Sequence, residues 1–317
     1  MDDESLNDNI NMEINFYTLL YIEKTEQRRL AGGEWGHDER LKVFLKNAAT
    51  LSASLYVDNI QGSSGVTILT NDSKTLERLC VDCNCTNLKY EQIEFSLEVP
   101  IGIPYYSAHF KIDAFRYLGL RPSTEYSVLL DNDVVGLRPF PRIFNEIANQ
   151  GIPMCYTLDI KDCDRTQEDA AKILSKTPII EWLGGEYISG NGQFFAKLYE
   201  ECQFVAPLYF KAIHQNLRHI GDEMITSLAM AILKENNLYY VDAGSLGIIY
   251  RYSGYHDKES IQKYNPVLAH IPVDKVWVAS HNFYMNFCPK KFLSKYKRHL
   301  RLYRLLDKIS RPFRNRK

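Results

Sequence analysis

The sequence predicts an α/β protein with a mostly parallel, mixed central sheet flanked by helices. Two observations carry this prediction. Short runs of β-branched and aromatic residues alternate with segments of helical periodicity, and one apolar run ends in two acidic residues. Alternation of strands and helices is typical of parallel sheets. The 317 residues, 45% of them hydrophobic, suffice for one large domain or two small ones.

The elements can be placed by their periodicity and by their helix signals. The expected strands are residues 14–22, 66–70, 91–96, 126–135, 152–158 and 193–195, and the expected helices are 41–55, a segment ending near 79, 107–120 and 222–233. Asn71 or Asp72 is placed to cap the second helix. Arg121 and Pro122 end the third, because the residue before a proline avoids the helical conformation.

The apolar run from Tyr126 delivers Asp131, Asn132 and Asp133 to its end. The carboxyl ends of strands are where α/β proteins place ligand sites. Asp131 and Asp133 are two positions apart, so on a continuing strand they share one face. Two carboxylates there suit Mg²⁺ or Mn²⁺ carrying substrate phosphates. The alternative is a turn rich in Asp and Asn that only ends the strand.

The composition is that of a globular protein from a reducing compartment. The chain has no apolar run of transmembrane length, and its polar N-terminus lacks the features of a secretory signal. Seven cysteines, an odd number, argue against a disulfide framework. Cys80, Cys83 and Cys85 would need a fourth ligand to hold structural zinc, and none lies nearby in sequence, so we expect ordinary thiols.

Positive charge is concentrated at the C-terminus. Residues 288–317 contain twelve lysines and arginines and one acidic residue, although the whole chain has a net charge of −1. Leucines and aromatic residues are interleaved with these cations, which predicts a basic amphipathic helix able to lie on an anionic membrane surface. A merely solvated tail and a nucleic-acid-binding segment are the alternatives.

Five separated segments resemble the GT-A glycosyltransferases, and in particular the retaining family typified by bacterial lipopolysaccharide galactosyltransferases and glycogenin, glycosyltransferase family 8. These segments are residues 109–113, 131–133, 184–192, 219–223 and 268–277. The resemblance implies a GT-A fold, a Rossmann-like scaffold for nucleotide-diphosphate sugars. It divides the chain into an N-terminus (1–12), a GT-A domain (13–288) and a basic, membrane-associating tail (289–317).

The resemblance also implies a metal-bound donor diphosphate. Asp131 and Asp133, with Asn132 between them, match the family's D-x-D motif, whose acids hold Mn²⁺ or Mg²⁺. His270 takes the place of the third metal ligand, and Lys275 that of a lysine on the diphosphate. This chain lacks the family's glycine between the two and is one residue shorter there.

The other matched positions imply contacts to the donor nucleotide sugar. Lys111 stands where the family has a donor-contacting arginine, and Ser189 and Asn191 lie in a small-residue segment that shapes the sugar pocket. Asp222 is expected on the sugar hydroxyls, and Glu223 near the anomeric centre, as the catalytic pair. The order of the small residues differs from the family's, and lysine keeps the charge of arginine but not its two-pronged geometry.

The function implied is that of a metal-dependent hexosyltransferase. It would move a sugar from a UDP-sugar donor to a glycan acceptor, lipid-linked surface polysaccharide or lipopolysaccharide, with retention of configuration. The expected location is cytoplasmic, at the inner face of the plasma membrane, without nucleic acid. A nucleotidyltransferase remains an alternative, because Arg28, Arg29 and Gly32-Gly33 follow the first strand. A non-enzymatic membrane adaptor is another.

Overall fold

The computed structural model describes residues 12–23, 29–30, 33–34, 36–57, 65–85, 88–158, 163–174, 179–252 and 261–314. The predicted α/β class is confirmed by a mixed seven-stranded sheet. Its strands follow the order β10 (Val241–Asp242), β8 (Met154–Thr157), β9 (Leu183–Asn191), β6 (Glu125–Leu130), β1 (Glu13–Leu19), β4 (Val66–Thr70) and β5 (Lys89–Gln92). β9 is antiparallel to both neighbours, whereas β8 pairs with β10, and β4 with β5, in parallel.

The chain forms two compact units. The first consists of residues 1–17, 93–130 and 141–243, and the second of residues 18–92, 131–140 and 244–317. Each unit is therefore built from three separate stretches of sequence.

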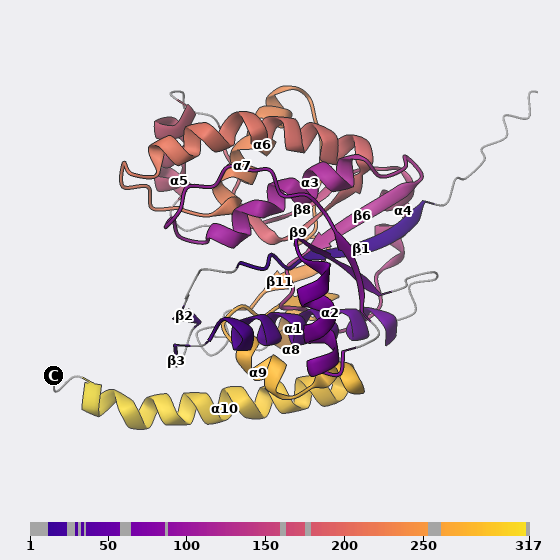
Figure 1. Cartoon of the computed structure of the whole chain (residues 1–317), viewed down its shortest axis with the longest axis vertical. Helices are drawn as coiled ribbons and strands as arrows, with labels where there is room; N and C mark the ends of the chain where they lie inside the picture. Colours follow the sequence, from indigo (N-terminus) through magenta and orange to yellow (C-terminus); the bar gives the residue numbers. More distant parts are fainter. Residues whose placement is uncertain are drawn as a thin grey trace, which may run out of the picture. The chain divides into compact units, whose positions relative to one another are not determined.

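In the first unit, helices pack on one another and on β9. Its helices are η1 (Tyr106–Phe110), α3 (Lys111–Gly119), α4 (Arg142–Asn149), α5 (Cys163–Leu174), α6 (Gly192–Ala212) and α7 (Asp222–Glu235). α6 contacts both α3 and α7, as Figure 1 shows, and α7 also contacts β9. The centre is filled by fully buried aromatic side chains such as Phe115, Phe195 and Tyr209.

The second unit contains a three-stranded sheet in the order β11 (Ile249–Arg251), β12 (Leu268–His270), β7 (Val134–Gly136). A two-stranded ribbon consists of β2 (Arg29–Leu30) and β3 (Gly33–Glu34). The helices are α1 (His37–Val57), α2 (Ser73–Asp82), α8 (Ile261–Tyr264), α9 (Lys275–Ser280), η3 (Phe283–Met285) and α10 (Pro289–Arg314). α1 contacts β7, α9 and η3.

The C-terminal basic segment is helical, as predicted, and its first half is part of the core. In Figure 1, α10 is the long yellow helix that ends the chain. Phe292, Tyr296 and Leu300 are buried in a cluster with residues of β7 and β12, including Val135 and Ala269. No helix in the described ranges is long and apolar enough to cross a membrane.

Several expected elements occur where the sequence placed them. β4 has the expected bounds, and the Asp72 side chain accepts a hydrogen bond from the Thr75 amide at the start of α2. Cys80, Cys83 and Cys85 are free thiols packed in the core. Burial raises the pKa of Cys80 to about 11, which is that of an inert buried thiol.

The expected strand at residues 193–195 is wrong, because this segment begins α6. The Asn191 side chain accepts a hydrogen bond from the Phe194 amide and so caps the helix. The strand lies one step earlier, as β9. The apolar Phe194 and Phe195 resemble a strand because they are buried, but burial is compatible with either type of element.

Replacement of Asp72 by alanine is expected to lower the free energy of unfolding by about 1 kcal/mol, because the Thr75 amide loses its capping partner. Chemical denaturation of the variant checks this value. Lys74→Ala, on an exposed position of the same helix, is the matched control and should change stability little. Equal stability of Asp72→Ala and wild type would contradict the capping role.

Candidate functional site

The acidic motif forms the connection between two buried strands. All six residues of β6 are buried, and so are the three of β7. Between them, the Val134 amide donates a hydrogen bond to the carbonyl oxygen of Asp131 at 3.3 Å, which closes a tight turn. The chain therefore turns at the acidic motif, as the alternative expected, and does not continue as one strand to residue 135. Asp133 is buried, whereas Asp131 and Asn132 are partly exposed.

The register of β12 on β7 brings His270 to this turn. The two strands are antiparallel, and His270 lies opposite Val134. The Ile271 amide extends the ladder by donating to the carbonyl oxygen of Asp133 at 3.1 Å. Backbone pairing thus places the imidazole next to the motif.

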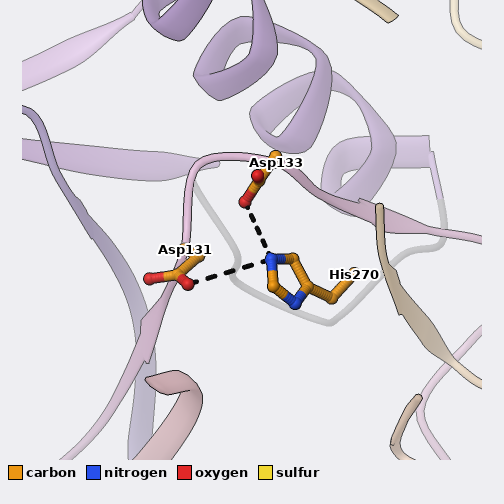
Figure 2. A group of neighbouring side chains, drawn as sticks. All are labelled: Asp131, Asp133 and His270. Carbon is orange, nitrogen blue, oxygen red and sulfur yellow. Dashed lines mark hydrogen bonds and ion pairs between the residues drawn. The ribbon is translucent and has the colours of Figure 1, made fainter. Parts of the chain in front are cut away.

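The three side chains form a candidate metal centre. The His270 Nε2 atom lies 3.1 Å from Asp133 Oδ1 and 3.9 Å from Asp131 Oδ2, as Figure 2 shows. One ligand atom from each residue lies within 4.8 Å of the others. Two carboxylates and one imidazole are a donor set that suits Mn²⁺, and the carboxylates also suit Mg²⁺. The residues predicted as metal ligands are therefore brought together.

Lys275 places a positive charge beside the candidate metal centre. Its Nζ atom is 3.0 Å from Asp133 Oδ2 and lies over the Phe44 ring, 5.6 Å from the centroid. Burial alone would raise the pKa of Asp133, but the charges of Lys275 and His270 and their hydrogen bonds hold it well below its usual range. The same ion pair raises the pKa of Lys275 against the opposing effect of burial. Asp133 is therefore an anion that contacts the Lys275 cation and the His270 imidazole.

A second group of predicted residues meets in the first unit. The Lys111 Nζ atom lies 2.8 Å from Asp222 Oδ2 and donates a hydrogen bond to the Gly185 carbonyl oxygen at 2.8 Å. Both charged side chains are buried, and each opens a helix, α3 and α7 respectively. Gly221, with φ of 131°, turns the chain into α7 in a conformation that side chains disfavour.

Glu223 is bonded at both carboxylate oxygens. Trp182 Nε1 donates to its Oε2 at 3.0 Å, and the Gly185 amide donates to its Oε1 at 3.1 Å. A Cβ atom on Gly185 would come within 2.8 Å of Lys111 Nζ. A side chain at this position would displace the Lys111 ammonium group, so glycine allows the close approach of β9 to these charged side chains.

Ser189 and Asn191 have internal roles. The Ser189 hydroxyl is buried and lies 3.1 Å from each of the Tyr126 and Tyr187 hydroxyls. The Asn191 side chain caps α6. Both side chains are bonded to residues outside the Asp133 and Asp222 groups, so the structure does not bring them to either group.

Sequence reasoning missed Trp182 and Phe44. Trp182 precedes the Gly184-Gly185 pair on a segment without a recognisable motif, and Phe44 lies within an ordinary helical pattern. A tryptophan just before a glycine-rich strand is a weak signal for the first. The position of Phe44 under Lys275 has no local signal, because it depends on the packing of α1 against α9.

The architecture matches solved glycosyltransferases. No protein-family model and no curated protein matches the sequence. Among solved structures, an active-site mutant of LgtC, a galactosyltransferase, matches at a TM-score of 0.51 and 11% identity, covering 84% of this chain and 95% of that one. The chain has the GT-A fold.

A second structural neighbour is the bifunctional glycosyltransferase WbbM in its apo form. It matches at a TM-score of 0.51 and 10% identity over 90% of this chain, which corresponds to 52% of the WbbM chain. The GT-A fold predicted from the five segments is thus confirmed by structure, although sequence identity is low.

Replacement of Lys111 by methionine is expected to lower the free energy of unfolding by about 3–5 kcal/mol, because it leaves the Asp222 charge buried without its cation. The double variant Lys111→Met/Asp222→Asn should regain part of that loss. Urea denaturation of the single and double variants measures both effects.

The matched control is Lys234→Met, which breaks an ion pair of 2.9 Å to Glu181 whose side chains are 43% and 45% exposed. Its cost should stay below about 1 kcal/mol. Equal costs for Lys111→Met and Lys234→Met would contradict a special role for the buried pair.

Proposed function

We propose that the protein is a metal-dependent glycosyltransferase that moves a hexose from a nucleotide-diphosphate donor, a UDP-sugar, to a glycan acceptor. The observation that carries the proposal is the group formed by Asp131, Asp133 and His270 at the end of a buried strand of a GT-A fold. The uridine nucleoside, and retention of anomeric configuration, rest on the family resemblance. The nucleotidyltransferase alternative depends partly on Arg28 and Gly32, which lie outside the described residues.

Asp131, Asp133 and His270 would hold Mn²⁺ or Mg²⁺. A divalent ion there neutralises the charge of a departing diphosphate, which is otherwise a poor leaving group. Asp133 supports this role because it is kept ionised by its neighbours. Asp131 is the most exposed of the three ligands and is therefore the one best placed to meet incoming phosphate and water.

Lys275 would supply a fixed positive charge to the diphosphate. It extends from the first turn of α9 and is held 3.0 Å from Asp133. A cation fixed before the reaction stabilises developing negative charge without reorganisation during the step. Lysine acts here as a point charge, which suits an oxygen-rich group whose orientation is set by other contacts.

In the first unit, we assign Asp222 and Lys111 to the donor sugar, on the strength of the matched segments. A carboxylate accepts hydrogen bonds from sugar hydroxyls, and Lys111 orients that carboxylate through an ion pair of 2.8 Å. Glu223 would act by holding Trp182 and Gly185 in place, since both of its oxygens are bonded to them. Ser189 and Asn191 have no part in this proposed site.

We further propose a lipid-linked acceptor, surface polysaccharide or lipopolysaccharide, reached from the cytoplasmic face of the membrane. The support is the second half of α10, where Leu302, Tyr303, Leu305 and Leu306 are exposed among arginines. Exposed leucines beside cations suit the boundary between lipid headgroups and acyl chains. Anionic lipid adds attraction for each arginine near the surface.

Asp131→Asn is expected to lower turnover about a hundredfold or more, because one anionic metal ligand becomes neutral. The assay measures Mn²⁺-dependent release of nucleoside diphosphate from a panel of UDP-sugars. Asp82→Asn, an exposed acid in the same unit, is the control and should keep full activity. The metal role would be refuted if the wild-type enzyme kept its full rate in excess EDTA, or if Asp131→Asn turned over at the wild-type rate. Release of pyrophosphate instead would favour a nucleotidyltransferase.

The triple variant Leu302→Ser/Leu305→Ser/Leu306→Ser is expected to lose most of its flotation with anionic liposomes, because apolar burial in the bilayer interface is removed. Ile101→Ser/Leu120→Ser/Ile179→Ser alters exposed apolar residues of the first unit and is the matched control. Truncation at residue 288 is unsuitable, since it would remove the buried Phe292 and Tyr296. Equal flotation of wild type and the α10 variant would rule out this membrane surface.

A further inference from the structure

α10 binds the short segment that precedes Lys275. Asp274 is buried, at 8% exposure, and each of its carboxylate oxygens has a partner on α10. The Tyr296 hydroxyl donates to Oδ2 at 2.7 Å, and His299 Nε2 lies 3.0 Å from Oδ1. We call Asp274, Tyr296 and His299 the α10 clamp.

Trp277, on α9, packs against the two rings of the α10 clamp. Its ring stacks on His299, with centroids 4.9 Å apart and planes at 22°, and it also contacts Tyr296 at 5.2 Å. His281 lies against the same indole at 4.5 Å. Because Trp277 and Lys275 belong to the same short helix, these ring contacts and the clamp restrict one rigid element.

The orientation of Asp274 is unusual for its position. It directly precedes α9, where an aspartate normally accepts a hydrogen bond from the helix's own amides. Its side chain makes no such bond. The carboxylate is bonded instead to Tyr296 and His299, which lie 22 and 25 residues farther along the chain. The interaction therefore links α10 to α9 at the cost of a local cap.

We propose that Tyr296 and His299 are positioning residues that set Lys275 for contact with the donor diphosphate. The inference rests on the proposed function for that last contact. Lys275 follows Asp274 directly, and its Nζ atom reaches Asp133 at 3.0 Å. A shift of the start of α9 moves this atom relative to the metal ligands, and small misplacements of a charged group are costly in a preorganised site.

The clamp gives α10 a function beyond the exposed basic surface. Phe292 and Leu300 are buried on the same helix and fix it in the core of the second unit, so the helix is a firm support for the two polar side chains. Partners that hold the residues of a metal site in place orient those residues, and their loss typically costs about 10–100-fold in metal affinity or activity.

The test uses the full-length variants Tyr296→Phe, His299→Ala and His299→Gln. His281→Gln is the matched control, because His281 touches Trp277 but makes no contact with Asp274. The first measurement is the rate at which an amine-reactive reagent labels Lys275, read by peptide mass spectrometry without metal or nucleotide. The second is the dissociation constant of uridine diphosphate with Mn²⁺, and thermal unfolding monitors global stability.

We expect His299→Ala and Tyr296→Phe to raise Lys275 labelling about tenfold, the effect of losing one hydrogen bond to a charged group. They should also weaken uridine diphosphate binding about tenfold. His299→Gln keeps a donor for Asp274 and should restore both values, and His281→Gln should leave both unchanged.

Unchanged labelling of Lys275 in both variants would overturn the inference, as would an equal rise at all lysines, which indicates global loosening. Raised labelling with unaltered uridine diphosphate affinity would overturn the positioning role. Absence of uridine diphosphate binding by the wild type would refute the proposed function itself. Even in that case, the rate of Lys275 labelling in the variants would decide whether the α10 clamp holds Lys275.

Discussion

The buried carboxylate of Asp133 is the constraint on which the second unit depends. An anion at the end of an apolar strand is stable only when cations and hydrogen-bond donors surround it. His270 and Lys275 meet this requirement at 3.1 and 3.0 Å. To bring them there, β12 must pair with β7 in one register, and α9 must start just beyond it. The same arrangement that stabilises the charge assembles the candidate metal centre.

The first unit uses a similar solution for a different charge. Lys111 and Asp222 are both buried, both begin helices, and neutralise each other at 2.8 Å. Gly185 lets a strand approach the pair, and Glu223 fixes that strand through its amide. A buried ion pair of this kind adds little net stability, because the cost of removing both charges from water offsets their attraction. In both units, a lysine and an aspartate thus define the position of the side chains proposed to act on the donor.

α10 contacts the segment beside Lys275 and also presents exposed residues at the surface of the protein. Its first half buries aromatic side chains and binds Asp274, whereas Leu302 to Leu306 in its second half are exposed among cations. The sequence pattern predicts the basic amphipathic helix, with cations exposed also in its first half, but it does not predict what the apolar face covers. In the first half, that face packs against residues of β7 and β12, strands that are distant in sequence.

The sequence alone determined the α/β class, a helix cap at Asn71 or Asp72, the acidic residues that follow the strand from Tyr126, and a helix beginning at Asp222. These features depend on local patterns of polarity and hydrogen bonding, which can be read residue by residue. The resemblance grouped His270 with Asp133, 137 residues away, but only the tertiary structure showed the strand pairing that joins them. It alone decided that Ser189 and Asn191 are used internally. It also assigned Tyr296 and His299 to Asp274. Long-range strand register and burial select these partners, and neither leaves a trace in a single segment of sequence.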